Sequence, residues 1–300
     1  MIIEFKKFVS FLFVIILLIS SCSDSNNEKK TGEDEVPEIQ QHFKFPPLPD
    51  HVVFCGTRVE LSNFDIRERL DKELIVNTYF HSHTIQAIKR ANRYFGQLEQ
   101  ELIKQKLPLD FKYLCLIESG LTQARSPAGA LGFWQLMPET AKQYGLRVDN
   151  EVDERMHILK STIAACRYLQ DANEKFDDWI VTSASYNRGI AGIASDLEEQ
   201  GVSSYFDLHL NSETSRYVFR MLAIKIIFEN KKAYGYDEDN MELYEPIKTR
   251  SITINNSLDD IKKWAKSQGS NYRMLKLLNP WILGNKLTYK NSSLIIELPV

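Results

Sequence analysis

Apolar residues recur every three or four positions over the central part of this 300-residue chain, and no alternating strand pattern interrupts them. In the clearest run, which begins near Thr84, one face of a long helix is formed by Ile88, Ala91, Phe95, Leu98 and Leu102. Pro108 suits the first turn of the next helix. Further helices are predicted over residues 139–144, 161–175, 179–186 and 215–228. Residues 84–248 are therefore expected to form a mostly α domain.

Residues 249–300 show a different pattern, with a short strand predicted at 251–254 and another at 293–298. Two helices are predicted between them, at 258–267 and 272–278. The unit resembles the LysM module, which binds glycans that contain N-acetylglucosamine. The residues that carry this resemblance are Leu258, Ile261, Ala265, Leu275, Leu278, Asn279 and residues 295–299. Because Asn256 and Ser257 replace the usual Gly-Asp pair, a packing appendage without sugar affinity stays open as the alternative.

The N-terminus has the order of an export signal, with Lys6 and Lys7 before an apolar stretch at residues 8–19. This stretch is too short to span a bilayer comfortably. The Ile-Ser-Ser-Cys that ends at Cys22 resembles the bacterial lipobox, in which the signal is cleaved before a cysteine that carries the lipid. We therefore expect a lipoprotein signal peptide at residues 1–21. The alternative is an anchor helix followed by an incidental cysteine.

The segment after Cys22 is poor in apolar residues and rich in Ser, Asn, Glu, Lys and Pro as far as residue 50. This composition predicts a disordered tether over residues 22–50. Residues 51–83 are expected to be a partly helical lead-in segment. The lipid would hold the protein at a membrane of the cell envelope, and we expect the outer membrane with the body facing the periplasm.

Composition and spacing argue against several other classes of function. A net charge of −3 with interspersed signs gives no reason to expect nucleic acid as a partner. His81 and His83 have no cysteine or carboxylate partner at metal-ligand spacing, so no metal or other cofactor is expected. Ser126 and Ser185 lack the motif of a serine hydrolase. The odd set Cys55, Cys115 and Cys166 excludes a complete disulfide framework, and we interpret the three as buried thiols with one pair possible.

Glu118 stands near the end of a predicted helix that is apolar on most sides, and Gly120 is positioned to end that helix. Burial and the negative end of the helix dipole both disfavour a carboxylate, so they raise the pKa of Glu118. A protonated carboxyl near neutral pH suits a general acid. The alternative is a glutamate that turns outward into water.

Small residues follow Glu118 from Ser126 to Gly132, as in a tight loop that another chain can approach closely. Phe133, Trp134 and Gln135 come next, two rings and an amide. Sugars offer flat apolar faces ringed by polar groups, so rings beside amides suit a glycan cleft. Tyr186 and Asn187 repeat the pairing at a predicted helix end, although each is equally consistent with a cap or a core contact.

Four motifs stand in the order of family 1 lytic transglycosylases: Glu118-Ser119, Gly132-Phe133-Trp134-Gln135, Ser185-Tyr186-Asn187 and Tyr217. The run from residue 84 to residue 228 fits that family. The stretches LPLDFKYLCLIESGL and GALGFWQLMPETAKQYGL are similar to a subgroup that also ends in LysM modules. Departures occur at Ser185, Arg188 and Ser215, where the family has alanine, a small residue and arginine respectively.

The resemblance implies a lysozyme-like α fold that cleaves the β-1,4 bond between N-acetylmuramic acid and N-acetylglucosamine in peptidoglycan and leaves 1,6-anhydromuramoyl ends. Glu118 would act first as acid and then as base, supported by Ser119 and Tyr217. The residues that would hold the glycan are Phe133, Trp134, Gln135, Tyr186 and Asn187. The enzyme is expected to be a monomer without cofactor.

Two alternatives remain. One is a goose-lysozyme-like hydrolase on the same fold, since a well-placed water would change the product. Such an enzyme needs a second carboxylate or a positioned water, and no acid lies near Glu118 in sequence except Asp110, at the far end of its helix, and Glu139, beyond the loop. The other alternative is a non-catalytic glycan-binding lipoprotein that keeps the fold as a scaffold.

Overall fold

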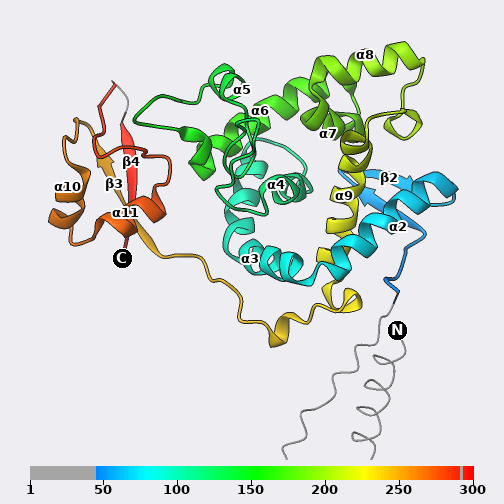
Figure 1. Ribbon diagram of the computed structural model, residues 1–300, viewed down its shortest axis with the longest axis horizontal. Helices are drawn as coiled ribbons and strands as arrows, with labels where there is room; N and C mark the ends of the chain where they lie inside the picture. The colour runs from blue at the N-terminus through cyan, green and yellow to red at the C-terminus, as the bar shows by residue number, and fades with distance from the viewer. Residues whose placement is uncertain (1–44, 291–292) are drawn as a thin grey trace, which may run out of the picture. The chain divides into compact units, whose positions relative to one another are not determined.

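The computed structural model describes residues 45–290 and 293–300 (Figure 1). The predicted signal peptide, the lipidation site Cys22 and most of the tether lie outside the described residues. Within the described ranges, no helix is both long enough and apolar enough to cross a membrane. The same ranges hold mainly α-helices and two small antiparallel sheets, which confirms the mostly α fold class with a small α+β unit at the C-terminus.

The α-helices of the described central part are α2 (Phe64–Tyr79), α3 (His81–Lys104), α4 (Phe111–Ser119), α5 (Pro138–Gln143), α6 (Ile158–Phe176), α7 (Trp179–Arg188), α8 (Ile190–Gln200) and α9 (Ser212–Glu229). Six of these helices lie close to the predicted positions, α2 falls in the segment expected to be partly helical, and α8 is an addition. Side chains of Asn63, Asp178 and Asn211 accept hydrogen bonds from the first free N–H groups of α2, α7 and α9. The sequence pattern did not predict α8, in which only Ile193 is buried.

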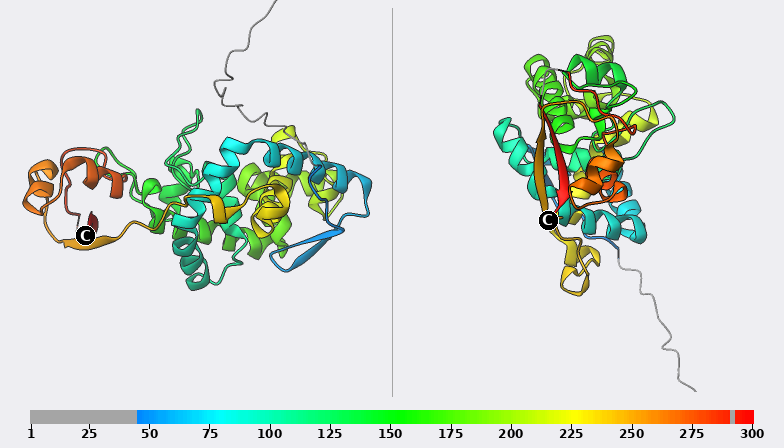
Figure 2. Two further views of the ribbon diagram at one scale, coloured as in Figure 1. Left: turned by 90° about the horizontal axis from the view of Figure 1, so that it is seen from below. Right: turned by 90° about the vertical axis from the view of Figure 1, so that its left-hand side faces the viewer.

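The core of the central part forms around α9, whose residues from Tyr217 to Phe228 are buried except Arg220. This helix contacts α2, α4 and α7 (Figures 1 and 2). On α2, the buried carboxylate of Glu73 accepts hydrogen bonds from the Arg216 guanidinium at 2.6 and 3.1 Å. The pair satisfies a charge that would otherwise be costly to bury. Since α9 contacts α4, its buried face can reach Glu118.

A β-hairpin begins the described part and was not predicted as such. Its strands are β1 (His51–Phe54) and β2 (Thr57–Glu60), joined by a turn in which Cys55 and Gly56 both have positive φ. Phe54 is fully buried and meets the ring of Phe111 edge to face. The Cys55 N–H donates to the Asp110 carboxylate at 2.7 Å. The hairpin therefore belongs to the same hydrophobic core as the helices that follow.

The C-terminal unit has the predicted β-α-α-β order. Its elements are β3 (Thr249–Ile254), α10 (Ile261–Ser267), α11 (Tyr272–Leu278) and β4 (Leu294–Pro299). The strands pair antiparallel, with Ile252 opposite Ile296. The unit has a hydrophobic cluster of its own, to which one residue of the central part, Val152, also belongs.

The three cysteines of the described residues are free thiols, two buried and one, Cys55, half-buried. No disulfide therefore links Cys55, Cys115 and Cys166.

Candidate active site

Glu118 lies on α4, one residue before the last position of the helix. The buried residues of α4 are Phe111, Tyr113, Leu114, Cys115 and Leu116. The helix stops at Gly120, whose φ of 62° lies in the left-handed region that favours glycine. Arg90 and Arg220 donate hydrogen bonds to the carbonyls of Gly120 and Ile117, at 2.5 and 3.0 Å. The end of α4 is therefore anchored by α3 and α9, and Glu118 is half-buried between them.

The carboxyl of Glu118 accepts a short hydrogen bond from the hydroxyl of Tyr217 on α9. Burial raises the pKa of Glu118 to about 7, although the Tyr217 hydrogen bond and the positive charge of Arg220 oppose the rise. Burial also raises the pKa of Tyr217 well above its ordinary value, so this hydroxyl keeps its proton. The site thus holds a carboxyl that is partly protonated near neutral pH and a tyrosine that is a permanent donor to it.

Ser119 connects the end of α4 to the loop that carries the second motif. Its hydroxyl donates to the carbonyl of Phe133 at 2.8 Å and accepts the N–H of Leu121 at 3.1 Å. Gly132 is required in this loop because its φ is 81° and a Cβ there would lie 2.1 Å from the carbonyl oxygen of Arg155. The small residues of the loop therefore allow a close approach, as expected. What approaches the loop is the backbone of this same chain at Arg155, not a bound chain.

Phe133 and Trp134, expected to stack on sugar rings, are buried at 3% and 0% exposure. The Phe133 ring packs edge to face on Tyr94, and the Trp134 indole N–H donates to the hydroxyl of Thr162 at 2.8 Å. Their side chains contact the protein core and are not exposed for stacking on a sugar, so their part in glycan binding stays a prediction. An aromatic pair beside a small-residue loop suits a core as well as a cleft, which is why the sequence alone misplaced the two rings.

Gln135, Tyr186 and Asn187 meet at one groove of about 550 Å³, which α5, α7 and α8 complete. Gln135 has a φ of 47°, and its amide nitrogen donates to the carbonyls of Ala124 and Gly132, both at 2.8 Å. Only the amide oxygen is therefore left to face a ligand. The Tyr186 hydroxyl donates to the carbonyl of Trp134 at 2.8 Å, which ties α7 to the loop.

Asn187 connects the end of α7 with the start of α9. Its amide oxygen accepts a hydrogen bond from the Thr214 hydroxyl at 2.8 Å, and its amide nitrogen donates to the Glu213 carboxylate at 3.3 Å. Because Tyr186 and Asn187 are neighbours on α7, these bonds set the groove beside the helix that carries Tyr217.

Glu213 is the acid that the sequence analysis missed. Its charge contributes to the rise in the pKa of Glu118, so the two carboxylates interact electrostatically. Glu213 is far from Glu118 along the chain, and α9 brings it close enough for its charge to act on Glu118. A signal was present, because Glu213 stands four residues before Tyr217 and so shares its helix face.

The departures from the family motifs have local explanations. The Ser185 hydroxyl is buried and donates to the carbonyl of Thr182 at 2.7 Å, and the Ser215 hydroxyl donates to the carbonyl of Ser212 at 3.4 Å. Arg188 lines the groove and pairs with Asp196 at 2.9 Å. Of the three, only Arg188 presents a different side chain to the groove. Among the described residues, no group of three or more His, Cys, Asp or Glu side chains could hold a metal ion.

Comparison with known proteins places two domains on the chain. Residues 98–207 match the family described as the transglycosylase SLT domain, and residues 250–300 match the soluble lytic transglycosylase C-terminal LysM-like domain. Membrane-bound lytic murein transglycosylase D of Escherichia coli strain K12 is 33% identical over 198 residues, which are 63% of this chain and 43% of that protein. The corresponding protein of Escherichia coli O6:H1, strain CFT073, gives the same values.

A solved structure of an inactive mutant of the lytic transglycosylase Slt from Pseudomonas aeruginosa is also similar, with 21% identity and a TM-score of 0.40. The similarity covers 58% of this chain and 32% of that one. The chain thus spans less than half the length of the curated relatives that it matches. The family matches and the curated relatives confirm the resemblance drawn from the motifs, since the chain carries a transglycosylase SLT domain followed by a C-terminal LysM-like domain.

Proposed function

We propose that this protein is a lytic transglycosylase that cleaves the β-1,4 bond between N-acetylmuramic acid and N-acetylglucosamine in peptidoglycan. The observation that carries the proposal is the half-buried carboxyl of Glu118, whose pKa burial raises to about 7 while Tyr217 donates a hydrogen bond to it. The names of the curated relatives and the SLT domain support the same reaction class.

In the first step, Glu118 donates its proton to the glycosidic oxygen as the bond from that oxygen to C1 of the muramic residue breaks. The N-acetylglucosamine residue leaves with this proton on its O4. The oxocarbenium character that develops at C1 is stabilised by the carbonyl oxygen of the substrate's own acetamido group. Tyr217 orients the carboxylate that remains and shares its negative charge through the hydrogen bond.

In the second step, the Glu118 carboxylate removes the proton from the C6 hydroxyl of the same muramic residue, and O6 forms a bond to C1. The acid is regenerated, no water is consumed, and the product ends in a 1,6-anhydro ring. An internal hydroxyl has a high effective molarity, so it competes well against water. Gln135, Tyr186 and Asn187 line the groove and would hold the glycan there. The charge of Glu118 acts on the Tyr186 hydroxyl, which supports a glycan position near the acid.

Hydrolysis is the second candidate function, because Glu213 supplies a second carboxylate in the field of Glu118. In an inverting glycosidase, that group would activate a water on the opposite face of the sugar. Glu213 is exposed and already receives a hydrogen bond from Asn187. We therefore favour a role for Glu213 in the electrostatics of the site.

The deciding experiment is to digest purified sacculi with the wild type, with Glu118→Gln and with Glu139→Gln, and to identify the product termini by mass spectrometry. Glu139 is an exposed glutamate just beyond the loop and controls for the loss of any one carboxylate. We expect anhydro ends from the wild type and from Glu139→Gln only. Reducing muramic ends would establish the hydrolase, and intact sacculi that still bind the wild-type protein would establish the scaffold.

We also propose that Cys22 carries a lipid that holds the enzyme at the envelope, and that the LysM-like unit adds affinity for peptidoglycan. The motif at residues 19–22 and the family match at residues 250–300 support these two proposals. Mass spectrometry of the membrane-extracted protein tests the first, since the Cys22→Ala variant must lose the acyl mass and partition into the aqueous fraction. Sacculus pull-down of the full chain and of a chain without residues 251–300 tests the second, since unchanged binding would remove the proposed affinity.

A further inference from the structure

The LysM-like unit, residues 249–300, contacts the segment of residues 147–157, here called the bridging segment. The other side of the bridging segment contacts the loop of residues 125–136, here called the active-site loop. We infer that the LysM-like unit supports the active-site loop mechanically and that Arg155 is the positioning residue that connects the two. The inference rests on the proposed function for its effect on turnover, but its structural part is independent of the reaction.

The bridging segment enters the core of the LysM-like unit through Val152. Val152 has no exposed surface and belongs to the hydrophobic cluster of that unit. Backbone hydrogen bonds flank it, from Asp153 N–H to the Trp281 carbonyl at 2.9 Å and from Leu283 N–H to the Glu151 carbonyl at 2.8 Å. Val152 and Ile282 form an antiparallel bridge. A tethered module would not need to bury a residue of the domain it follows.

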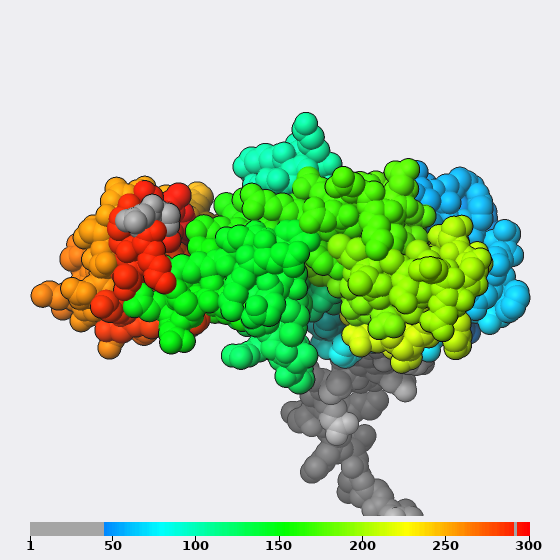
Figure 3. Space-filling model, turned by 90° about the horizontal axis from the view of Figure 1, so that it is seen from above, coloured from blue at the N-terminus to red at the C-terminus, as the bar shows by residue number. Residues whose placement is uncertain are grey.

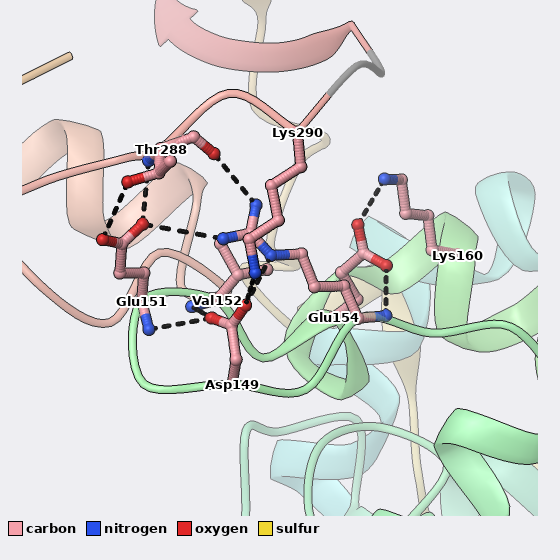
Figure 4. A network of polar contacts seen from close by, with 8 residues as sticks. Asp149, Glu151, Val152, Glu154, Lys160, Thr288 and Lys290 are labelled. Atoms are coloured by element: carbon pink, nitrogen blue, oxygen red, sulfur yellow. Dashed lines mark hydrogen bonds and ion pairs between the residues drawn. The ribbon is translucent and has the colours of Figure 1, made fainter. Parts of the chain in front are cut away.

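A polar network surrounds this contact (Figure 4). The carboxylate of Glu151 accepts hydrogen bonds from the backbone N–H and the hydroxyl of Thr288, at 2.8 and 2.9 Å. Asp149 pairs with Lys290 at 2.9 Å and with Arg147 at 2.8 Å. The space-filling view shows residues of the C-terminal unit, in red, against residues of the central part, in green (Figure 3). Because surface pairs contribute little singly, this network mainly fixes the register around Val152.

The other side of the bridging segment holds the active-site loop through Arg155. This guanidinium is buried at 5% exposure and pairs with Asp153 through bonds of 2.7 and 2.9 Å. It also donates to the carbonyls of Gly129 and Leu136, at 2.8 and 3.1 Å. Since these carbonyls lie on either side of Gln135 in the chain, Arg155 fixes both ends of the segment that presents Gln135 to the groove.

Two neighbouring contacts make the attachment close. The backbone carbonyl of Arg155 lies where a Cβ of Gly132 would stand, so the loop can approach only with glycine at that position. The side-chain amide of Gln123 donates to the Met156 carbonyl at 3.0 Å. The N–H of Asp153 is bonded to the Trp281 carbonyl of the LysM-like unit. A displacement of Asp153 therefore moves Arg155, two residues further on, and with it the loop carbonyls that Arg155 holds. In a packed interior such a shift is transmitted because there is no free volume to absorb it.

The test uses the full chain and Val152→Asp, which places a charge in the shared cluster. Ile295→Asp is the matched control, because it puts the same side chain on the exposed face of β4, where Ile295 is 51% exposed. The readouts are hydrogen-deuterium exchange of peptides covering residues 125–136 and turnover of a short soluble glycan of two disaccharide units. So short a glycan does not need a second binding module, which separates support of the loop from affinity for the wall.

We expect Val152→Asp to speed exchange in residues 125–136 while peptides of α3 and α9 keep their protection. We also expect kcat on the short glycan to fall by about tenfold to a hundredfold with a smaller change in KM, since a displaced loop misplaces the substrate. Ile295→Asp should match the wild type in both. Arg155→Lys keeps the positive charge beside Asp153 but loses the guanidinium that bonds Asp153 and the two loop carbonyls at once. It should therefore give the same faster loop exchange and lower kcat as Val152→Asp.

Unchanged exchange in residues 125–136, with faster exchange confined to residues 249–300, would overturn the inference. If Val152→Asp does not fold, Glu151→Ala at the surface of the contact takes its place and should shift the same loop peptides by a smaller amount. If the wild type makes no anhydro ends, the proposed function fails, whereas loop exchange still decides whether the LysM-like unit supports the loop.

Discussion

The hydroxyl of Tyr217 donates a hydrogen bond to the carboxyl of Glu118 and so joins α9 to α4 between residues 99 positions apart in the sequence. Burial raises the pKa of Glu118 to about 7, and this hydrogen bond limits the rise because it stabilises the carboxylate. The balance suits a group that must first donate a proton and then accept one.

The first prediction concerns the pH dependence of the reaction. Turnover should fall as the pH rises through about 7, because the proton-donating form of Glu118 is lost. Tyr217→Phe removes a hydrogen bond that lowers the pKa of Glu118. The alkaline limb of the pH–rate profile should therefore move to higher pH, while the maximal rate falls about tenfold or more. Tyr234→Phe, which loses a hydroxyl bonded to Pro47, is the control and should leave the profile unchanged. A limb that moves to lower pH in Tyr217→Phe would contradict the assignment.

Glu213→Gln should move the same limb in the opposite direction. The negative charge of Glu213 raises the pKa of Glu118, so its removal lowers that pKa and brings the alkaline limb to lower pH. The rate at pH 5 should change only a few fold if Glu213 has an electrostatic role alone. A loss of about a thousandfold at every pH, with reducing product ends in the wild type, would make Glu213 the base of a hydrolase.

Glu118→Gln should stabilise the fold in a pH-dependent way. The folded pKa of about 7 lies above the ordinary pKa of 4.5 of a free glutamate, so the unfolded chain loses this proton first as the pH rises. Below pH 4 the variant should match the wild type, and above pH 7 its free energy of unfolding should be larger by roughly 3 kcal/mol. Urea denaturation at pH 4, 6 and 8 measures this, with the exposed Glu139→Gln as a control that should show no such trend.

Gly132→Ala should be far more destabilising than Gly129→Ala. Both glycines have positive φ, 81° and 94°, so each substitution costs about 1 kcal/mol in backbone strain. Only at Gly132 does the new Cβ meet a backbone atom, the Arg155 carbonyl oxygen at 2.1 Å, whereas nothing lies within 4 Å at Gly129. We expect a total loss of about 3 kcal/mol or more for Gly132→Ala, measured by thermal denaturation. Equal losses in the two variants would mean that the loop does not approach Arg155 so closely.

Trp134→Phe separates a core role from a sugar-stacking role. The indole is fully buried and its N–H is bonded to Thr162, so the variant should lose about 1 to 3 kcal/mol of stability. Glycan affinity, measured by calorimetry in a Glu118→Gln background, should change less than threefold. A large loss of affinity with unchanged stability would restore the stacking role that the sequence suggested.

Much of the secondary structure was predictable because periodicity reports it directly. The long helix near Thr84 and the β-α-α-β order after residue 248 both follow from local spacing. The hairpin of residues 51–60 was not predicted, since its burial depends on contact with Phe111, far along the chain. The helix α8 was not predicted because little of it is buried.

The sequence by itself determined the mostly α fold class, the position of Glu118 at the end of an apolar helix and the motif order that identifies an SLT domain. Tertiary structure alone decided that Trp134 belongs to the core, that Glu213 shares the field of Glu118, and that Val152 is buried in the C-terminal unit. Periodicity shows which face of an element is apolar but not what covers it. Which element packs against that face depends on contacts between residues that are distant in the sequence, and a local pattern carries no information about those contacts.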